Sequence, residues 1–138
     1  MMLEIHNAIW LFVVIFMLHD FEEIISVEHW AKKTESSIKS DGGKLAKKIW
    51  NFWNVNSNTF AKRDVMIFSI MSAIIFLKVQ FVESNWSAIL FICFLAFVLI
   101  HNAVHMVQTL ILRKYTPGLY TAILTVTPYS IYLFYRLA

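Results

Sequence analysis

The fold is decided by residues 9–23, which read IWLFVVIFMLHDFEE. The first ten of these residues carry no charge, and the next five bring together one imidazole and three carboxylates. A helix in water carries such a cluster at little cost, whereas in lipid an ionisable group costs several kcal/mol unless it is paired, bound to a metal or wetted. The apolar run and the polar cluster that follows it therefore indicate a functional site within a helix.

The composition extends the apolar pattern to the whole chain. Of its 138 residues 59% are hydrophobic and 15% are charged, against roughly 45–50% and about 25% in ordinary globular domains. Four apolar segments each approach the roughly 20 residues that cross a bilayer as a helix. They are residues 5–25, 65–82, 86–112 and 119–137. We therefore expect an all-α integral membrane bundle of four transmembrane helices, with residues 1–138 as one domain. The alternative is a soluble helical bundle, but few polar residues remain to coat four such helices.

The basic residues predict an orientation. Ten of the twelve Lys and Arg residues lie in residues 28–63 or at Arg113 and Lys114. The positive-inside rule then makes residues 28–63 a cytoplasmic loop of a multi-pass cell inner-membrane protein, with both termini outside. Within that loop, from Lys44 onward, Leu45, Ile49, Phe52 and Trp53 have the spacing of a short amphipathic interfacial helix. Asp64 is expected to cap the next helix. No aromatic-basic pattern typical of a nucleic-acid groove is present.

A second polar pair lies in the third apolar segment. His101 and His105 are four residues apart and share a helical face, and His19, Glu22 and Glu23 also share one face of the first helix. In helices that enter from the same side, His19 would lie about 21 Å along one axis and His101 about 22 Å along the other. We therefore expect the two clusters to meet at one level.

Two imidazoles that face two carboxylates predict a divalent metal site. Zinc, which accepts His nitrogen and Glu oxygen, is the first expectation, iron with two His and one carboxylate is the second, and a two-metal site with bridging carboxylates stays open. The alternatives are a solvated helix end and a structural network of hydrogen bonds and ion pairs. The candidate metal ligands are His19, Glu22, Glu23, His101 and His105.

The order His-x-x-Glu-Glu is similar to the inverted zincin pattern His-x-x-Glu-His with its last ligand changed. By that analogy His19 and Glu23 bind the metal, and Glu22 is the general base. Asn102 is expected to orient His105 or a substrate from outside the ligand set.

The chain also resembles the HXXEE-motif family of small bacterial integral membrane proteins. The resemblance depends on the sequence from His19 to Glu23, on His101 and His105, and on the turn at Pro117-Gly118. The family is of uncharacterised function, and its His and Glu residues have led to the suggestion that it contains membrane enzymes. The resemblance implies that His19, Glu22 and Glu23 are key positions, and it implies no substrate, reaction or metal.

These observations favour a membrane metalloenzyme that hydrolyses a lipid-like or amphipathic substrate with a metal-activated water. One alternative is a metal-ion or proton translocator, since polar residues in spanning helices mark ion pathways. Another is a non-catalytic membrane subunit whose cluster is a structural polar network. The expected partners are membrane lipid or an amphipathic small molecule and no nucleic acid, and a homo-oligomer is left open.

Overall fold

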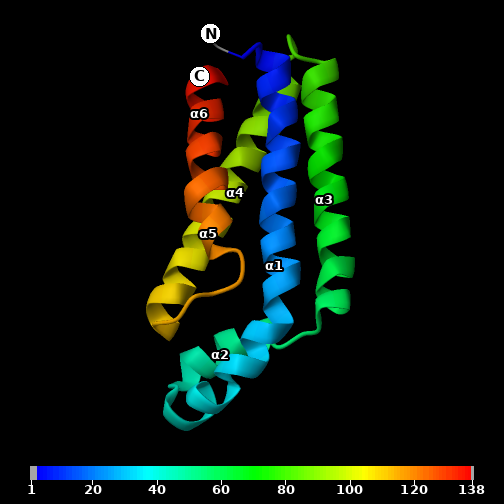
Figure 1. Ribbon diagram of the computed structural model, residues 1–138. Coiled ribbons are helices and arrows are strands. Elements are labelled where there is room, and N and C mark those ends of the chain that lie inside the picture. Colours follow the sequence, from blue (N-terminus) through cyan, green and yellow to red (C-terminus); the bar gives the residue numbers. More distant parts are fainter. Residues whose placement is uncertain (1–2, 138) are drawn as a thin grey trace.

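Helix α1 (Ile5–Asp41) runs the length of the molecule in the computed structural model, which describes residues 3–137 (Figure 1). Its 37 residues include no Gly or Pro, so nothing in the sequence interrupts the backbone hydrogen bonds. Beyond residue 25 the helix is supported by salt bridges four residues apart, Glu28–Lys32 at 2.7 Å and Glu35–Lys39 at 2.5 Å. The polar stretch that was expected to begin a loop therefore continues the helix.

Helix α2 (Lys44–Trp53) lies across the end of the bundle that is opposite the two termini (Figure 1). The sequence predicts an amphipathic helix here, and part of its apolar face packs against protein. Ile49, Trp50 and Trp53 are buried, and the indole of Trp50 donates a hydrogen bond of 3.1 Å to the carbonyl of Ala31. Trp50 thus fastens α2 to α1.

Helix α3 (Ser57–Gln80) packs along α1, and α4 (Asn85–Leu112) lies beside it. Helix α3 begins eight residues before residue 65, where the predicted apolar segment starts. Its N-cap is Asn56, whose side-chain oxygen accepts a 2.8 Å hydrogen bond from the amide of Thr59. The prediction that Asp64 caps this helix is therefore wrong, because Asp64 lies within the helix and is 4% exposed.

The last apolar segment forms three elements: α5 (Leu119–Thr121), a π-helical segment η1 (Ala122–Val126) and α6 (Thr127–Leu137). Pro128 has no amide hydrogen to donate, and π-helical turns occur where a regular ladder cannot continue. Before α5 the chain makes a turn in which Gly118 has φ of 80°. This loop returns between α4 and α1 (Figure 1).

Two groups of buried apolar side chains hold the bundle together. The first lies toward the termini and includes Ile9, Phe12 and Phe16 of α1. The second lies toward α2 and includes Val27 and Trp30 of α1. Between them α1 presents three buried polar residues, which are His19, Asp20 and Glu23. The sequence of α1 therefore places ionisable groups at the level where the two apolar groups meet.

The prediction of four transmembrane helices is wrong. Among the described residues, α4 is the one helix that is long and apolar enough to cross a membrane. The other apolar segments are interrupted: α1 carries three carboxylates near its middle, α3 carries Lys62, Arg63, Asp64 and Lys78, and residues 119–137 are divided among three short elements. One apolar helix is compatible with membrane association, but it does not support the multi-pass location that was expected.

Candidate metal centre

The structure brings four of the five predicted ligands together. His19 and Glu23 come from adjacent turns of α1, and His101 and His105 come from adjacent turns of α4. One ligand atom from each of the four residues lies within 4.8 Å of the others. The two helices run in the same direction from the same end of the bundle (Figure 1), which brings the clusters to one level.

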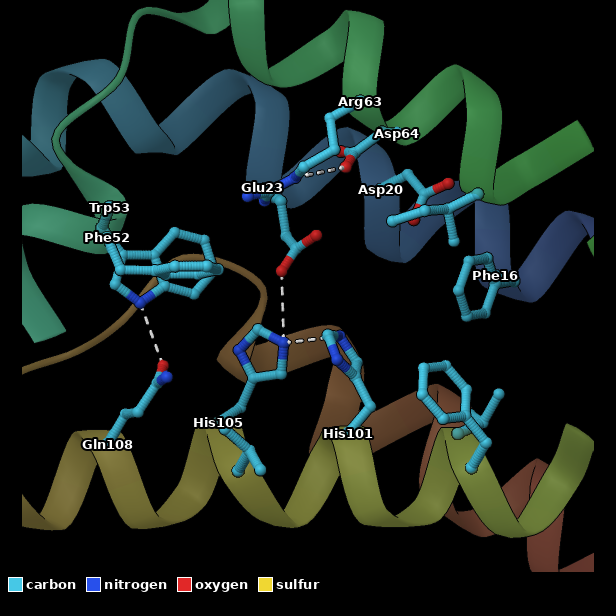
Figure 2. A pocket seen from close by; sticks show the side chains of 14 residues that line it. Phe16, Asp20, Glu23, Phe52, Trp53, Arg63, Asp64, His101, His105 and Gln108 are labelled. Atoms are coloured by element: carbon cyan, nitrogen blue, oxygen red, sulfur yellow. Dashed lines mark hydrogen bonds and ion pairs between the residues drawn. The ribbon is translucent and has the colours of Figure 1, made fainter. Parts of the chain in front are cut away.

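The shortest contacts in this group of four involve the Nε2 atom of His105. This atom lies 2.9 Å from Nε2 of His101 and 3.2 Å from Oε1 of Glu23 (Figure 2). The same carboxylate oxygen is 3.9 Å from Nε2 of His19. Three imidazole nitrogens and one carboxylate oxygen therefore converge on a small volume.

Two ligand atoms of this group are buried and have no hydrogen-bond partner. His19 is 0% exposed and Glu23 is 5% exposed. Neither Nε2 of His19 nor Oε1 of Glu23 makes a hydrogen bond of acceptable geometry, although Oε1 is close to the His105 ring. A buried polar atom without a partner costs free energy, and a bound cation would give both atoms a partner. Nitrogen and carboxylate ligands of this kind suit Zn²⁺.

The electrostatics of the group also suit a cation. Burial is the main cause that lowers the pKa of His19 to about 3, and the neighbouring imidazoles of His105 and His101 lower it further. Burial raises the pKa of Glu23 to about 8. Neutral imidazole is the form that binds a metal, whereas a carboxyl group must release its proton to do so. His19 is therefore ready to bind an ion at neutral pH, and Glu23 would lose a proton on binding.

Glu22, the fifth predicted ligand, lies outside this group. Its Oε2 accepts hydrogen bonds from the Thr121 amide at 2.7 Å and the Thr121 hydroxyl at 2.6 Å. Its Oε1 accepts from the Tyr115 hydroxyl at 2.5 Å and the Tyr120 amide at 3.2 Å. A carboxylate in this position satisfies amide groups that a helix start leaves free. Glu22 thus binds the beginning of the last helical segment to α1.

Thr121 connects Glu22 to the group of four. Its hydroxyl has one hydrogen, whose acceptors are Oε2 of Glu22 at 2.6 Å and the Gly118 carbonyl at 3.3 Å, so its oxygen accepts from Nδ1 of His19 at 3.0 Å. A proton on Nδ1 leaves the lone pair on Nε2, the atom that faces Glu23. Thr121 therefore orients His19 and selects the tautomer that a metal ligand needs.

Asn102, the predicted supporting residue, does not contact His105 by a hydrogen bond. It is 1% exposed, and its side-chain nitrogen donates to the Thr127 hydroxyl at 2.9 Å. Asn102 therefore joins α4 to α6 instead of orienting an imidazole.

A cavity of about 350 Å³ adjoins the group of four (Figure 2). Its walls are mostly apolar, and its polar lining includes one cation, Arg63 of α3. Trp53 of α2 closes one side, where its indole donates a 2.9 Å hydrogen bond to Gln108 and its ring lies 5.7 Å from that of His105. The remaining apolar walls are Phe16, Phe52, Ile67, Phe97, Val98 and Val104.

Two acidic residues in the cavity wall were not predicted as site residues. Asp20, which points about 100° away from His19 on the helix, was expected to lie at the surface or to support the ligands from outside their set, and Asp64 was expected to cap a helix. The structure brings both close to Glu23. Both residues are carboxylates beside an apolar segment, and this shared position in the sequence was the signal that could have identified them.

Comparison with known proteins agrees with the motif. The sequence model of the HXXEE family, described as proteins of unknown function with an HXXEE motif, matches residues 10–133. No curated protein and no solved structure matches the chain. The matched residues include all four members of the group, most of α1 and the whole of α4. The chain therefore belongs to the HXXEE-motif family, and its motif is the stretch from His19 to Glu23.

Proposed function

We propose that the protein binds a divalent metal ion through His19, Glu23, His101 and His105, with zinc favoured over iron. The observation that carries the proposal is the convergence of four potential ligands within 4.8 Å, two of which are buried atoms without hydrogen-bond partners. Two ligands at about 2.1 Å from one ion can be at most about 4 Å apart, so small side-chain rotations would close the group around an ion.

We further propose that the bound ion activates a water molecule for hydrolysis. A metal ion lowers the pKa of its bound water to about 7, which supplies a nucleophile at neutral pH. The cavity offers room for a substrate next to the ligands. Glu22 has no proton-transfer role in this proposal, because its two oxygens already accept four hydrogen bonds.

The cavity walls support an amphipathic or lipid-like substrate. They combine aromatic side chains such as Phe52 and Trp53 with the guanidinium of Arg63, which could bind an anionic group. The outer side of α4 also exposes large apolar residues, among them Ile100 and Leu110 at 65% and 75%. Exposed apolar surface of this kind is typical of proteins that meet lipid or other apolar partners.

Translocation is less well supported. A path for ions needs polar groups at several levels. Toward the termini, the group of four is bordered by the buried side chains of Phe12, Phe16 and Leu95. The polar residues therefore do not continue toward the termini, as a path across the bundle would require.

Elemental analysis of the purified full chain tests the metal proposal. We expect at least one zinc or iron per chain, and loss of metal in His19→Ala, His105→Ala and Glu23→Gln variants. His6→Ala is the matched control, because His6 is an exposed residue of α1 away from the ligands. A wild-type protein without metal, prepared without chelators and unable to bind added zinc, would overturn the proposal and favour a structural polar network.

A further inference from the structure

A second group of potential ligands shares Glu23 with the first. One oxygen each from Asp20, Glu23 and Asp64 lies within 4.8 Å of the others. Asp20 and Glu23 come from α1, and Asp64 comes from α3. Figure 2 shows Glu23 between the two aspartates on one side and the imidazoles of His101 and His105 on the other. Glu23 is thus the common member of two adjoining ligand groups.

These three carboxylates are buried. Asp20 is 7% exposed, Glu23 is 5% exposed and Asp64 is 4% exposed. Removing a carboxylate from water is costly unless it is paired or coordinates a metal. Oδ2 of Asp64 is buried and has no hydrogen-bond partner. An unpartnered oxygen of a buried carboxylate, close to two other carboxylates, indicates that a positive group belongs at this position.

The protein supplies too little positive charge for the three carboxylates. The nearest cation is Arg63, whose Nε lies 3.9 Å from Oδ1 of Asp64 and also lacks a hydrogen-bond partner. Its guanidinium lies over the ring of Phe60 at 4.2 Å, and its side chain is 40% exposed. When all three carboxylates are ionised, one guanidinium at this distance balances at most one of the three charges, and the other two match a divalent cation.

From this geometry we infer that the site holds two metal ions, with the carboxylate of Glu23 bridging them. The inference rests on the proposed function, because the first ion is the one bound by His19, His101 and His105. The second ion would be bound by Asp20, Asp64 and the other oxygen of Glu23. In two-metal sites the ions are about 3.5–4 Å apart, which is the separation that one carboxylate can bridge.

The two positions differ in the ions they favour. The first is rich in imidazole nitrogen, which suits zinc or iron, whereas the second is made of carboxylate oxygens, which suit a harder ion such as Mn²⁺. Both adjoin the same cavity, since its lining includes Asp20, Asp64, His101 and His105. A substrate in the cavity would therefore meet both ions.

The test is metal stoichiometry of the full chain, first stripped with chelator and then loaded with Mn²⁺ alone or with Zn²⁺ and Mn²⁺ together. We expect two ions per chain in the wild type and one in Asp64→Asn and Asp20→Asn. The matched control is Asp41→Asn at the exposed end of α1, which should keep two. Circular dichroism checks that each variant is folded.

A spectroscopic measurement needs no variant. Two Mn²⁺ ions bridged by a carboxylate are magnetically coupled, so the electron paramagnetic resonance spectrum of the Mn²⁺-loaded wild type should differ from that of isolated Mn²⁺. One ion per chain with an uncoupled spectrum overturns the two-ion inference and leaves the proposed function intact. One ion that is lost altogether in Asp64→Asn also overturns it, because Asp64 would then be a ligand of a single site. A wild type that binds no ion overturns both proposals.

Discussion

Gly118 lies directly against the ring of His19: a Cβ added to Gly118 would be 2.8 Å from Cε1 of that ring and 2.7 Å from Cγ of Glu23. No real Cβ atom approaches another group so closely, and the φ of 80° at Gly118 is itself unfavourable for other residues. The turn at Pro117-Gly118 therefore forms one wall of the group of four.

Gly118→Ala tests this contact. We expect the free energy of unfolding to fall by roughly 1–3 kcal/mol, from backbone strain and the clash with His19, and metal affinity to fall with it. Gly43→Ala is the matched control, since a Cβ there meets nothing within 4 Å. Thermal unfolding and metal titration measure the two effects. Equal behaviour of the two variants would show that the turn does not support the site.

Thr121→Val removes the hydroxyl that orients His19 while keeping the shape of the side chain. We expect metal affinity to fall roughly 10–100-fold, because groups that orient a ligand typically contribute this much. The control is Thr125→Val, whose hydroxyl donates to the carbonyl of Thr121 one turn earlier in the chain. Isothermal titration with zinc measures both, and an unchanged affinity in Thr121→Val would contradict the orienting role.

Glu22→Gln separates the two acidic residues of the motif. Because Glu22 accepts four hydrogen bonds from α5 and the loop before it, we expect the variant to lose roughly 1–3 kcal/mol of stability. Its metal stoichiometry should remain that of the wild type, unlike that of Glu23→Gln. Glu35→Gln, which breaks only an exposed ion pair with Lys39, should change stability by less than about 1 kcal/mol. Loss of metal in Glu22→Gln would make Glu22 a ligand.

Stability of the metal-free protein should depend on pH. Burial raises the pKa of Glu23 and of Asp20 to about 8 and that of Asp64 to about 7. Between pH 6.5 and 8 the folded chain retains protons that the unfolded chain has lost, so stability falls as pH rises through this range. His19, with its lowered pKa, has the opposite effect only below about 6.5.

Thermal unfolding in chelator at several pH values between 6.5 and 8 measures this slope. We expect the melting temperature to fall with rising pH, and excess zinc to remove or reverse the trend, because an ion stabilises the ionised carboxylates. A flat profile in chelator would mean that the carboxylates already have a positive partner.

The convergence of the clusters could be anticipated from the sequence because it depends only on helical rise. His19 lies 14 residues after Ile5, the first residue of α1, and His101 lies 16 residues after Asn85, the first residue of α4. Parallel helices that begin at one end of a bundle bring such residues to one level, whether or not lipid surrounds them. Counting residues from the start of each helix therefore predicted correctly that the two clusters lie at the same level, although the prediction of four membrane-spanning helices was wrong.

The acidic side of the cavity could not be anticipated in this way. Residues 28–63 were taken for a loop because they are rich in charge, yet ion pairs four residues apart extend α1 to Asp41, and Asn56 starts α3 early. Only with α3 in place does Asp64 come close to Glu23. The role of Glu22 was also hidden, since its partners lie about 95 residues away in the sequence, at Tyr115 and Thr121.

The unbroken course of α1 has a consequence for how the protein melts. A single helix supplies Phe12 to one apolar group and Trp30 to the other, so neither group can come apart without loosening an element that the other requires. Both groups should therefore be lost in one cooperative transition, and the α1 amides around Phe12 and around Trp30 should exchange their hydrogens with the same free energy of opening.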